Sequence, residues 1–206
     1  MFRDREEAAL GLAERLDQYK GKNPLILAIP RGAVPMAKII ADELNGHFDV
    51  VLVRKLRAPY QPELAIGSID ESGWTYIADY AEMTGADKAY IESEKHVQME
   101  TIKKRRAQYT PVRESIDPAG RIVIVVDDGL ATGATMISAL HGLRNRKPSK
   151  LICAVPVSPP HTLKKVAELA DEVVCLEIHS DFQAVGQYYL AFPQVEDEEV
   201  INLLQS

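Results

Sequence analysis

Two adjacent carboxylates, Asp127 and Asp128, stand between an apolar run and a short loop of small and hydroxyl-bearing residues. Carboxylates repel a phosphate, but they can accept hydrogen bonds from two vicinal hydroxyls or help to hold a metal ion bound to those hydroxyls. The loop from Gly129 to Thr135 lets an anion approach backbone N–H groups, and its threonines add hydroxyl donors. The combination predicts a site for a sugar that carries a phosphate.

The residues before the acid pair, 121–126, form a continuous β-branched run. Such runs are typical of a parallel sheet covered by helices on both faces. A strand here brings the two acids to the carboxyl edge of the sheet, where α/β proteins bind ligands. A helix that follows the loop would turn the positive end of its dipole toward the phosphate.

The rest of the chain alternates apolar runs with amphipathic segments. Strands are predicted at 25–29, 48–53, 64–69, 74–78, 121–126, 151–157 and 172–177, and helices from residue 4 to about 21 and at 35–44, 87–109, 134–145 and 161–170. The first two strands should form a right-handed βαβ unit, and the strands around Glu71 to Gly73 a hairpin. We therefore expect one domain over 1–206, with a doubly wound, mainly parallel α/β sheet flanked by helices.

The stretch from Ile124 to Thr135 reads Ile-Val-Val-Asp-Asp-Gly-Leu-Ala-Thr-Gly-Ala-Thr and resembles the fingerprint of the type I phosphoribosyltransferase family. The resemblance implies that Asp127 and Asp128 contact the ribose hydroxyls of phosphoribosyl pyrophosphate (PRPP). It assigns the 5′-phosphate to Gly129, Leu130, Ala131, Thr132, Gly133, Ala134 and Thr135. With Pro-Arg-Gly-Ala-Val-Pro at 30–35 and Pro-Glu-Leu-Ala-Ile-Gly at 62–67, the chain looks like a bacterial subgroup of predicted phosphoribosyltransferases whose acceptor is unassigned.

The resemblance also implies a reaction. A nitrogen acceptor, a nucleobase or a related compound, attacks the anomeric carbon of PRPP while pyrophosphate leaves. Mg²⁺ is the implied cofactor, bound indirectly through PRPP, with Asp127 and Asp128 as further candidate ligands. Fixed cations near the diphosphate would stabilise the charge that develops on the leaving group. The implied assembly is a homodimer.

Two basic segments are candidates for the pyrophosphate site. A glycine-containing turn follows the first strand, and in the resembled family this loop binds pyrophosphate, which assigns that role to Arg31, Gly32, Ala33 and Val34. The second strand runs into Arg54, Lys55 and Arg57, and Lys55 best matches a cation that related transferases carry there. The implied catalytic residues are Asp127, Asp128, Lys55 and Arg31. Taken alone, each segment can also be explained as a solvated turn.

The resemblance divides the chain further. A hairpin and helix insertion at about 58–120 is longer than the mobile lid of the family, so the lid is not identified. The segment at about 179–206 is the implied hood over the acceptor, where Phe182 is the first candidate for stacking on a base and Tyr188 the second. His179, at the end of a predicted strand, is a further candidate to line the acceptor pocket. Simple packing of these aromatic rings explains them at least as well.

A second function stays open because the same fold occurs in regulators that bind PRPP or nucleotides without turning them over. In that case the basic cluster Lys103-Lys-Arg-Arg106 would bind nucleic acid or a partner. The cluster could also reach the phosphates, or it could be a solvated helix end. A nucleoside-triphosphate hydrolase is disfavoured, because the Thr/Gly loop lacks the lysine of a Walker A sequence.

Composition sets the remaining limits. The 206 residues, 46% of them apolar, can supply the core of one domain, and a formal charge of −6 argues against broad nucleic-acid binding. No apolar run approaches the roughly 18 residues of a membrane span, and the charged start is unlike a signal peptide, so we expect a cytoplasmic protein. Cys153, Cys175 and the five histidines lack the spacing of a metal site.

Overall fold

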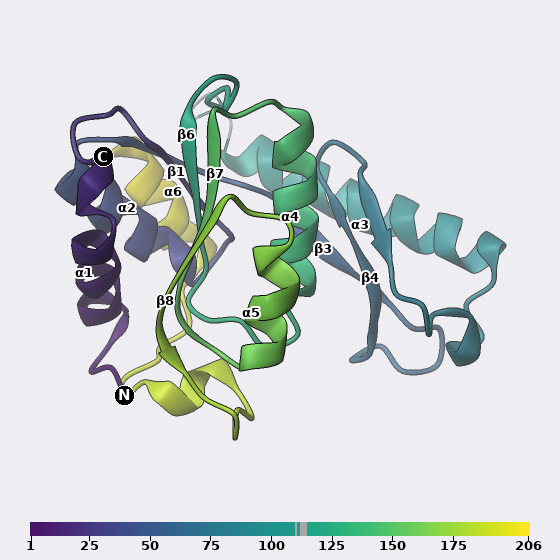
Figure 1. Ribbon diagram of the computed structural model, residues 1–206. Coiled ribbons are helices and arrows are strands. Elements are labelled where there is room, and N and C mark those ends of the chain that lie inside the picture. The colour runs from purple at the N-terminus through teal and green to yellow at the C-terminus, as the bar shows by residue number, and fades with distance from the viewer. Residues whose placement is uncertain (110, 112–114) are drawn as a thin grey trace.

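The computed structural model describes residues 1–109, 111 and 115–206. Its main sheet has five strands in the order β2-β1-β6-β7-β8, and every pairing between neighbours is parallel (Figure 1). These strands are β1 (Leu25–Ala28), β2 (His47–Val50), β6 (Ile122–Val126), β7 (Lys150–Ser158) and β8 (Glu172–Ile178). The predicted doubly wound, mainly parallel sheet is confirmed.

Helices cover both faces of this sheet because successive residues of a buried strand point to opposite sides. Ile124 and Val126 of β6 pack with α1 (Arg5–Arg15) and α2 (Ala33–Leu44). Val123 and Val125 pack with α4 (Ala134–Asn145), and α5 (Pro160–Ala167) covers the same face (Figure 1). The continuous apolar run at 121–126 therefore reflects burial on both sides. The first helix ends at Arg15 and is followed by the 3₁₀ turn Asp17–Tyr19, earlier than the predicted end near residue 21.

A second, three-stranded antiparallel sheet lies beside α4 and has the order β3-β4-β5 (Figure 1). It contains β3 (Val53–Arg57), β4 (Ala65–Asp70) and β5 (Thr75–Ile77), and it is followed by the 3₁₀ turn Glu82–Thr84 and by α3 (Lys88–Tyr109), which packs on β3 and β4. The hairpin predicted around Glu71 to Gly73 joins β4 to β5. Four residues of the predicted insertion, 110 and 112–114, lie outside the described residues.

The prediction of one strand over 48–53 is wrong. β2 ends at Val50, Val51 donates a last backbone hydrogen bond to Ala28 of β1, and Val53 already pairs with Asp70 of the other sheet. Hydrophobicity continues through the break because Val51 and Leu52 are buried where the chain passes from one sheet to the other. A run of buried apolar residues does not show where its hydrogen-bond partners change.

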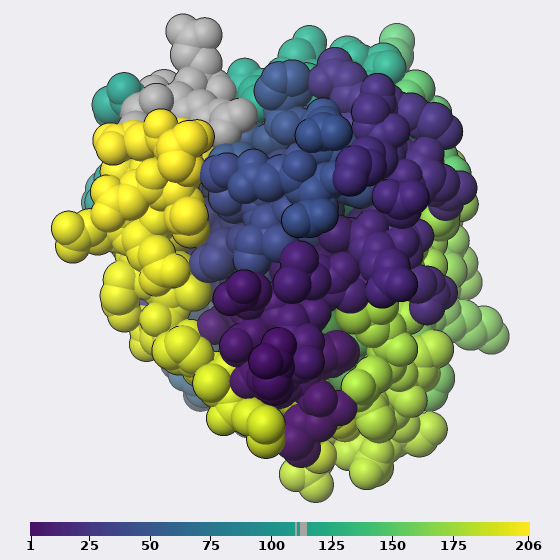
Figure 2. All heavy atoms as spheres, turned by 90° about the vertical axis from the view of Figure 1, so that its left-hand side faces the viewer, coloured from purple at the N-terminus to yellow at the C-terminus, as the bar shows by residue number. Residues whose placement is uncertain are grey.

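The two ends of the chain pack together. Phe2 forms a parallel bridge with Tyr189, and the N-terminal and C-terminal segments lie side by side on the surface in Figure 2. The C-terminal segment contains the 3₁₀ turn Val185–Tyr188 and a helix that the sequence pattern did not predict, α6 (Asp197–Gln205). Its first turn is the acidic run at 197–199, and carboxylates there are stabilised by the positive end of the helix dipole. Among the described residues, no helix combines the length and apolar character needed to cross a membrane.

Candidate functional site

The acid pair lies where predicted, directly after β6 at the carboxyl edge of the main sheet. The backbone N–H of Asp128 donates to Oδ1 of Asp127 over 2.9 Å. Burial raises the pKa of the Asp127 carboxyl well above its ordinary value, the negative charge of Asp128 adds to that rise, and Lys55 opposes it. Asp127 is therefore a carboxylate whose charge is poorly balanced in the protein alone, which suits a group that receives hydroxyl donors or a cation from a ligand.

Asp128 has a protein partner that the sequence pattern did not reveal. Arg5 of α1 donates to Oδ2 of Asp128 from Nε over 3.1 Å and from Nη2 over 3.0 Å, and the two side chains are only 11% and 16% exposed. Burial raises the pKa of the Asp128 carboxyl, and Arg5 opposes that rise. No local spacing signals this pair, because its partners stand at opposite ends of a long stretch of chain. The two acids thus differ, since Asp128 is paired with an arginine and Asp127 has no such partner among the described residues.

The loop after the acids leads into the first turn of α4. Two of its carbonyl groups accept hydrogen bonds from side chains outside the loop. The Thr162 hydroxyl donates to Ala131 O over 2.7 Å, and the Ser68 hydroxyl donates to Ala134 O over 3.1 Å. Among the described residues, no acceptor takes a hydrogen bond from the N–H of Ala131, Thr132 or Gly133. Gly133 has φ of +79°, a conformation that favours glycine, and α4 begins at the next residue.

Two other residues of the predicted phosphate loop, Leu130 and Thr135, have different surroundings. Leu130 is buried, and its N–H donates to Val157 O over 2.9 Å, so it anchors the loop to β7. Thr135, at the start of α4, lines a cavity that also contains Lys55. The loop therefore combines unpaired backbone donors, a helix N-terminus and a threonine that faces a basic cavity, which is the arrangement expected for a phosphate site.

The predicted pyrophosphate loop meets the acid pair. A Cβ atom at Gly32 would stand 2.1 Å from Asp128 Oδ2, so only glycine allows this loop to approach so closely. Arg31 is turned toward the C-terminal segment, where its Nη1 lies 3.5 Å from Glu196 Oε2 and 3.8 Å from Asp197 Oδ1. Ala33 and Val34 are buried in the first turn of α2. The side chains of these two residues therefore pack in the core, and only the backbone of this turn can face a ligand.

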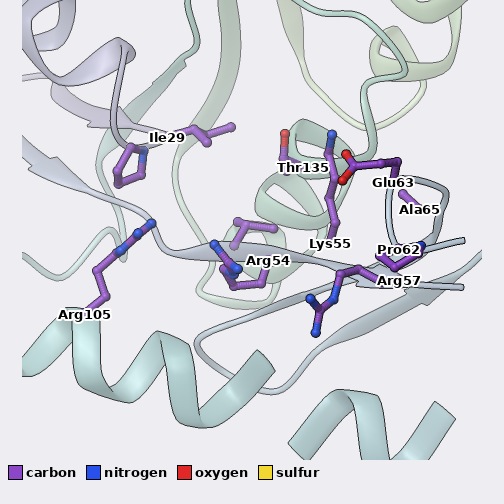
Figure 3. A pocket seen from close by; sticks show the side chains of 11 residues that line it. Ile29, Arg54, Lys55, Arg57, Pro62, Glu63, Ala65, Arg105 and Thr135 are labelled. Carbon is purple, nitrogen blue, oxygen red and sulfur yellow. The ribbon is translucent and has the colours of Figure 1, made fainter. Parts of the chain in front are cut away.

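A basic cavity of about 310 Å³ opens between the two sheets (Figure 3). Its basic side chains are Arg54, Lys55 and Arg57 of β3 and Arg105 of α3, and its acidic side chain is Glu63. Ile29 and Pro30 at the end of β1 and Thr135 at the start of α4 complete the side nearest the main sheet. Burial lowers the pKa of the Arg54 guanidinium, and the charges of Arg105 and Arg57 lower it further. Mutual repulsion of this kind favours binding of a polyanion.

Arg54 and Arg57 of β3 both contact α3. Arg54 Nε donates to Gln98 over 3.0 Å and Arg57 Nε donates to Glu94 over 3.0 Å. Together with Lys55, both arginines line the basic cavity. The structure therefore brings the three predicted basic residues of β3 into one cavity.

A second cavity, of about 360 Å³, adjoins the basic one and shares Lys55, Glu63 and Ala65 with it. Its wall includes Thr132 and Ala134 of the predicted phosphate loop, Tyr76 of β5, Tyr80 of the segment after β5, and His161 and Lys165 of α5. The phosphate loop thus borders both cavities. None of the predicted acceptor residues lines either of them.

The predicted acceptor residues are brought together in the C-terminal segment. The Tyr188 ring stacks with His179 at a centroid distance of 4.5 Å and with Phe182 at 5.1 Å. Tyr188 is buried, and its hydroxyl has no hydrogen-bond partner in the part of the chain that the structure describes. His179 also lies 2.9 Å from a carboxylate oxygen of Glu177. Tyr188 is therefore surrounded by neighbouring rings, whereas Phe182 keeps a partly exposed face.

The basic cluster at 103–106 is divided among different surroundings. Lys103 pairs with Glu100, and Arg106 pairs with Glu71 while donating to Val50 O over 3.2 Å. Lys104 is exposed, and Arg105 lines the basic cavity. The four cations therefore have different surroundings, and Arg105 is the member that lines the basic cavity.

This geometry agrees with what comparison with known proteins finds. The family model described as a phosphoribosyl transferase domain matches residues 4–193. The chain belongs to the phosphoribosyl transferase domain family. The matched residues include both acids, the phosphate loop, the basic cavity and Arg5. The family resemblance drawn from residues 124–135 is confirmed.

Relatives of this phosphoribosyl transferase domain have been found in bacteria. Two curated proteins of Mycobacterium tuberculosis, from strains CDC 1551 and H37Rv, are each named "Putative phosphoribosyl transferase" and are 40% identical over 205 residues, which is 99% of this chain and 46% of theirs. The chain therefore spans about half the length of these curated relatives. Among solved structures, the protein TT1426 from Thermus thermophilus is 42% identical with a TM-score of 0.85, covering 99% of this chain and 97% of that one.

A purine phosphoribosyltransferase from Pyrococcus horikoshii Ot3 shares the fold at 16% identity, with a TM-score of 0.52 and coverage of 93% of both chains. At such low identity the likeness concerns the architecture of the chain and not its acceptor. The phosphoribosyl transferase fold of the chain is therefore established by independent matches at high and low identity.

Proposed function

We propose that this protein is a phosphoribosyltransferase that transfers the ribose 5-phosphate of PRPP to a nitrogen acceptor, with release of pyrophosphate. One observation carries the proposal: the start of the phosphate loop's helix, at Thr135, lines the same cavity as the cations of β3. PRPP carries a phosphate at one end and a diphosphate at the other. A loop with unpaired N–H donors beside a cluster of cations provides complementary charge for both ends.

Different residues of the site would bind the 5′-phosphate, the ribose and the diphosphate of PRPP. The backbone of 131–133 and the hydroxyls of Thr132 and Thr135 bind the 5′-phosphate, and the acids orient the ribose. Asp127 is the better ribose and cation ligand, because Asp128 is already paired with Arg5. Lys55 and its neighbouring arginines stabilise the negative charge that develops on the departing diphosphate.

The donor set fits Mg²⁺ only as an ion carried by the substrate. Among the described residues, no group of three or more histidine, cysteine or acidic side chains could enclose a metal ion. Asp127, with Asp128 beside it, would hold Mg²⁺ together with oxygens of PRPP. When bound, the ion would neutralise part of the diphosphate charge and so ease its departure.

Calorimetric titration with PRPP and Mg²⁺ tests the first half of the proposal. A screen for pyrophosphate release from the PRPP complex, against nucleobases, amines and other small nitrogen nucleophiles, tests the second half. Saturable binding with acceptor-dependent release is the expected result, and it names the acceptor. Binding without release from any acceptor would identify a PRPP-binding regulator instead, and failure to bind PRPP would overturn the proposal.

A matched pair of variants ties the result to the site. Asp127→Asn removes the unpaired carboxylate and should abolish most PRPP binding. Asp171→Asn, on the surface beside β7 and paired with Arg144, removes the same charge away from the cavities and should leave PRPP affinity unchanged.

A further inference from the structure

Helix α3 places several side chains on the face that covers the basic strand. Glu94, Gln98 and Arg105 follow one another at intervals of four and seven residues, the spacing of one helical face. Glu94 and Gln98 are buried although both are polar, and Arg105 lines the basic cavity. Buried polar side chains need hydrogen-bond partners, and the partners of these two are the arginines of β3.

Glu94 is the centre of this network. Its Oε1 accepts hydrogen bonds from the backbone N–H and the Nε of Arg57, each over 3.0 Å, and from Nε2 of Gln98 over 2.9 Å. Burial would raise the pKa of the Glu94 carboxyl, but the bonds from Arg57 and Gln98 outweigh it and leave the pKa lowered. The carboxylate therefore stays charged at neutral pH and holds the Nε edge of Arg57.

Gln98 continues the network to the second arginine. Its Oε1 accepts from Arg54 Nε over 3.0 Å, while its amide group donates to Glu94. The Nε atoms of Arg54 and Arg57 thus both donate hydrogen bonds to side chains of α3. No hydrogen bond or ion pair within the described residues engages their outer Nη groups, which remain available to a ligand.

Arg105 differs because no described residue pairs with it. The described residues contain no hydrogen-bond or ion-pair partner for its guanidinium, although it lies close enough to Arg54 to lower the pKa of that group. Figure 3 shows Arg105 projecting from α3 into the cavity toward Arg54. Three guanidinium groups and Lys55 line this cavity against the single acid Glu63, and such an excess of positive charge is complementary to a multiply charged anion.

We propose that α3 supplies half of a diphosphate site, with Arg105 contacting the diphosphate directly and with Glu94 and Gln98 as positioning residues for Arg57 and Arg54. This inference rests on the proposed function, because it takes the diphosphate of PRPP as the ligand of the basic cavity. The helix is then a structural part of substrate recognition, although it lies within the insertion outside the main sheet.

Calorimetry with inorganic diphosphate, PRPP and ribose 5-phosphate tests Arg105. Arg105→Gln should weaken diphosphate and PRPP binding about tenfold, because a charge-assisted hydrogen bond is worth roughly one order of magnitude in affinity, and should leave ribose 5-phosphate binding unchanged. Lys104→Gln is the control, since it removes one positive charge from an exposed neighbour on the same helix. Equal diphosphate affinity in the Arg105 and Lys104 variants would overturn the direct contact.

Glu94→Gln tests the positioning role. The variant should bind diphosphate about tenfold more weakly than the wild type at a temperature where both are folded, with ribose 5-phosphate affinity retained. Glu92→Gln is its control, because Glu92 is exposed and pairs with Lys95. A lower unfolding temperature with an unchanged ratio of diphosphate to ribose 5-phosphate affinity would show that Glu94 only stabilises the fold.

The two proposals fail in different ways. A wild-type protein that binds neither PRPP nor diphosphate overturns the proposed function and this inference with it. A wild-type protein that binds both, with α3 variants that match their controls, overturns the role of α3 alone.

Discussion

The guanidinium of Arg5 grips Asp128, the second acid of the fingerprint, through two hydrogen bonds of 3.1 and 3.0 Å to one carboxylate oxygen. The same guanidinium donates to Pro193 O over 2.6 Å and lies 3.9 Å from the centroid of the Phe192 ring. One arginine thus joins the first helix, the acid pair and the C-terminal segment. The Tyr189 hydroxyl adds a second link, because it donates to Asp128 O over 2.7 Å, so both terminal segments contact the residues of the acid pair.

Removal of this arginine should destabilise the protein. Arg5→Gln leaves Asp128 largely buried without a cation, and we expect a loss of about 2 kcal/mol in the free energy of unfolding. Urea unfolding followed by circular dichroism measures it. Arg3→Gln is the control, since Arg3 forms an exposed pair with Glu7 and should change stability by less than about 0.5 kcal/mol. Equal losses in the two variants would mean that the Arg5 pair contributes no more than a surface ion pair.

The ionised Asp127 carboxylate should lower the free energy of unfolding of the ligand-free protein. The folded protein raises the pKa of its carboxyl, so the folded state binds the proton more tightly than the unfolded state does. Its contribution to stability consequently falls as pH rises from the unfolded value of about 3.9 through the folded pKa. Asp127→Asn removes this loss and should stabilise the ligand-free protein by about 0.5–2 kcal/mol at neutral pH, while weakening PRPP binding.

Unfolding measurements between about pH 4 and pH 8 check this sign, because the interval starts near the ordinary pKa of an aspartate. The wild type should gain less stability, or lose more, than Asp127→Asn as pH rises. Curves that run parallel over the whole interval would show that Asp127 titrates alike in the folded and unfolded states.

Gly32 should not tolerate a side chain. A Cβ there would stand 2.1 Å from Asp128 Oδ2 and 2.9 Å from Arg5 Nη2, so Gly32→Ala must displace the loop or break the ion pair. We expect a loss of about 1–3 kcal/mol in stability and weaker diphosphate binding. Gly11→Ala is the control, because it adds the same group inside α1 against the flexible end of Leu176 and improves helix propensity. A stable Gly32→Ala protein with normal diphosphate affinity would refute the close approach.

The aromatic rings of the C-terminal segment can be tested separately. Tyr188→Phe removes a buried hydroxyl without a described partner and should leave stability and kinetics nearly unchanged. If Phe182 stacks on the acceptor, Phe182→Leu should raise the KM for the acceptor several-fold without altering PRPP affinity, since one aromatic stacking contact is worth about 1 kcal/mol. An unchanged acceptor KM would leave Phe182 as a packing residue of the Tyr188 stack and would favour the cavity lined by Tyr76 and Tyr80 as the acceptor site.

Sequence alone determined the parts of this protein that depend on local pattern. The β-branched run at 121–126, the acids behind it and the glycine loop predicted a strand, a turn and a helix, and β6 and α4 lie there. Periodicity of this kind is local, because a strand buried on both faces must be apolar throughout. The basic residues of β3 were also predicted as a group, and they do line one cavity.

Tertiary structure decided which charged side chains form ion pairs. Asp127 and Asp128 are neighbours of the same type, yet only Asp128 pairs with Arg5, which lies 123 residues away in the sequence. Arg105 and Arg106 are also neighbours, but Arg106 is neutralised by Glu71 while Arg105 faces the cavity. Electrostatic pairing depends on distance in space, and the fold sets that distance between segments whose separation in sequence carries no information about it.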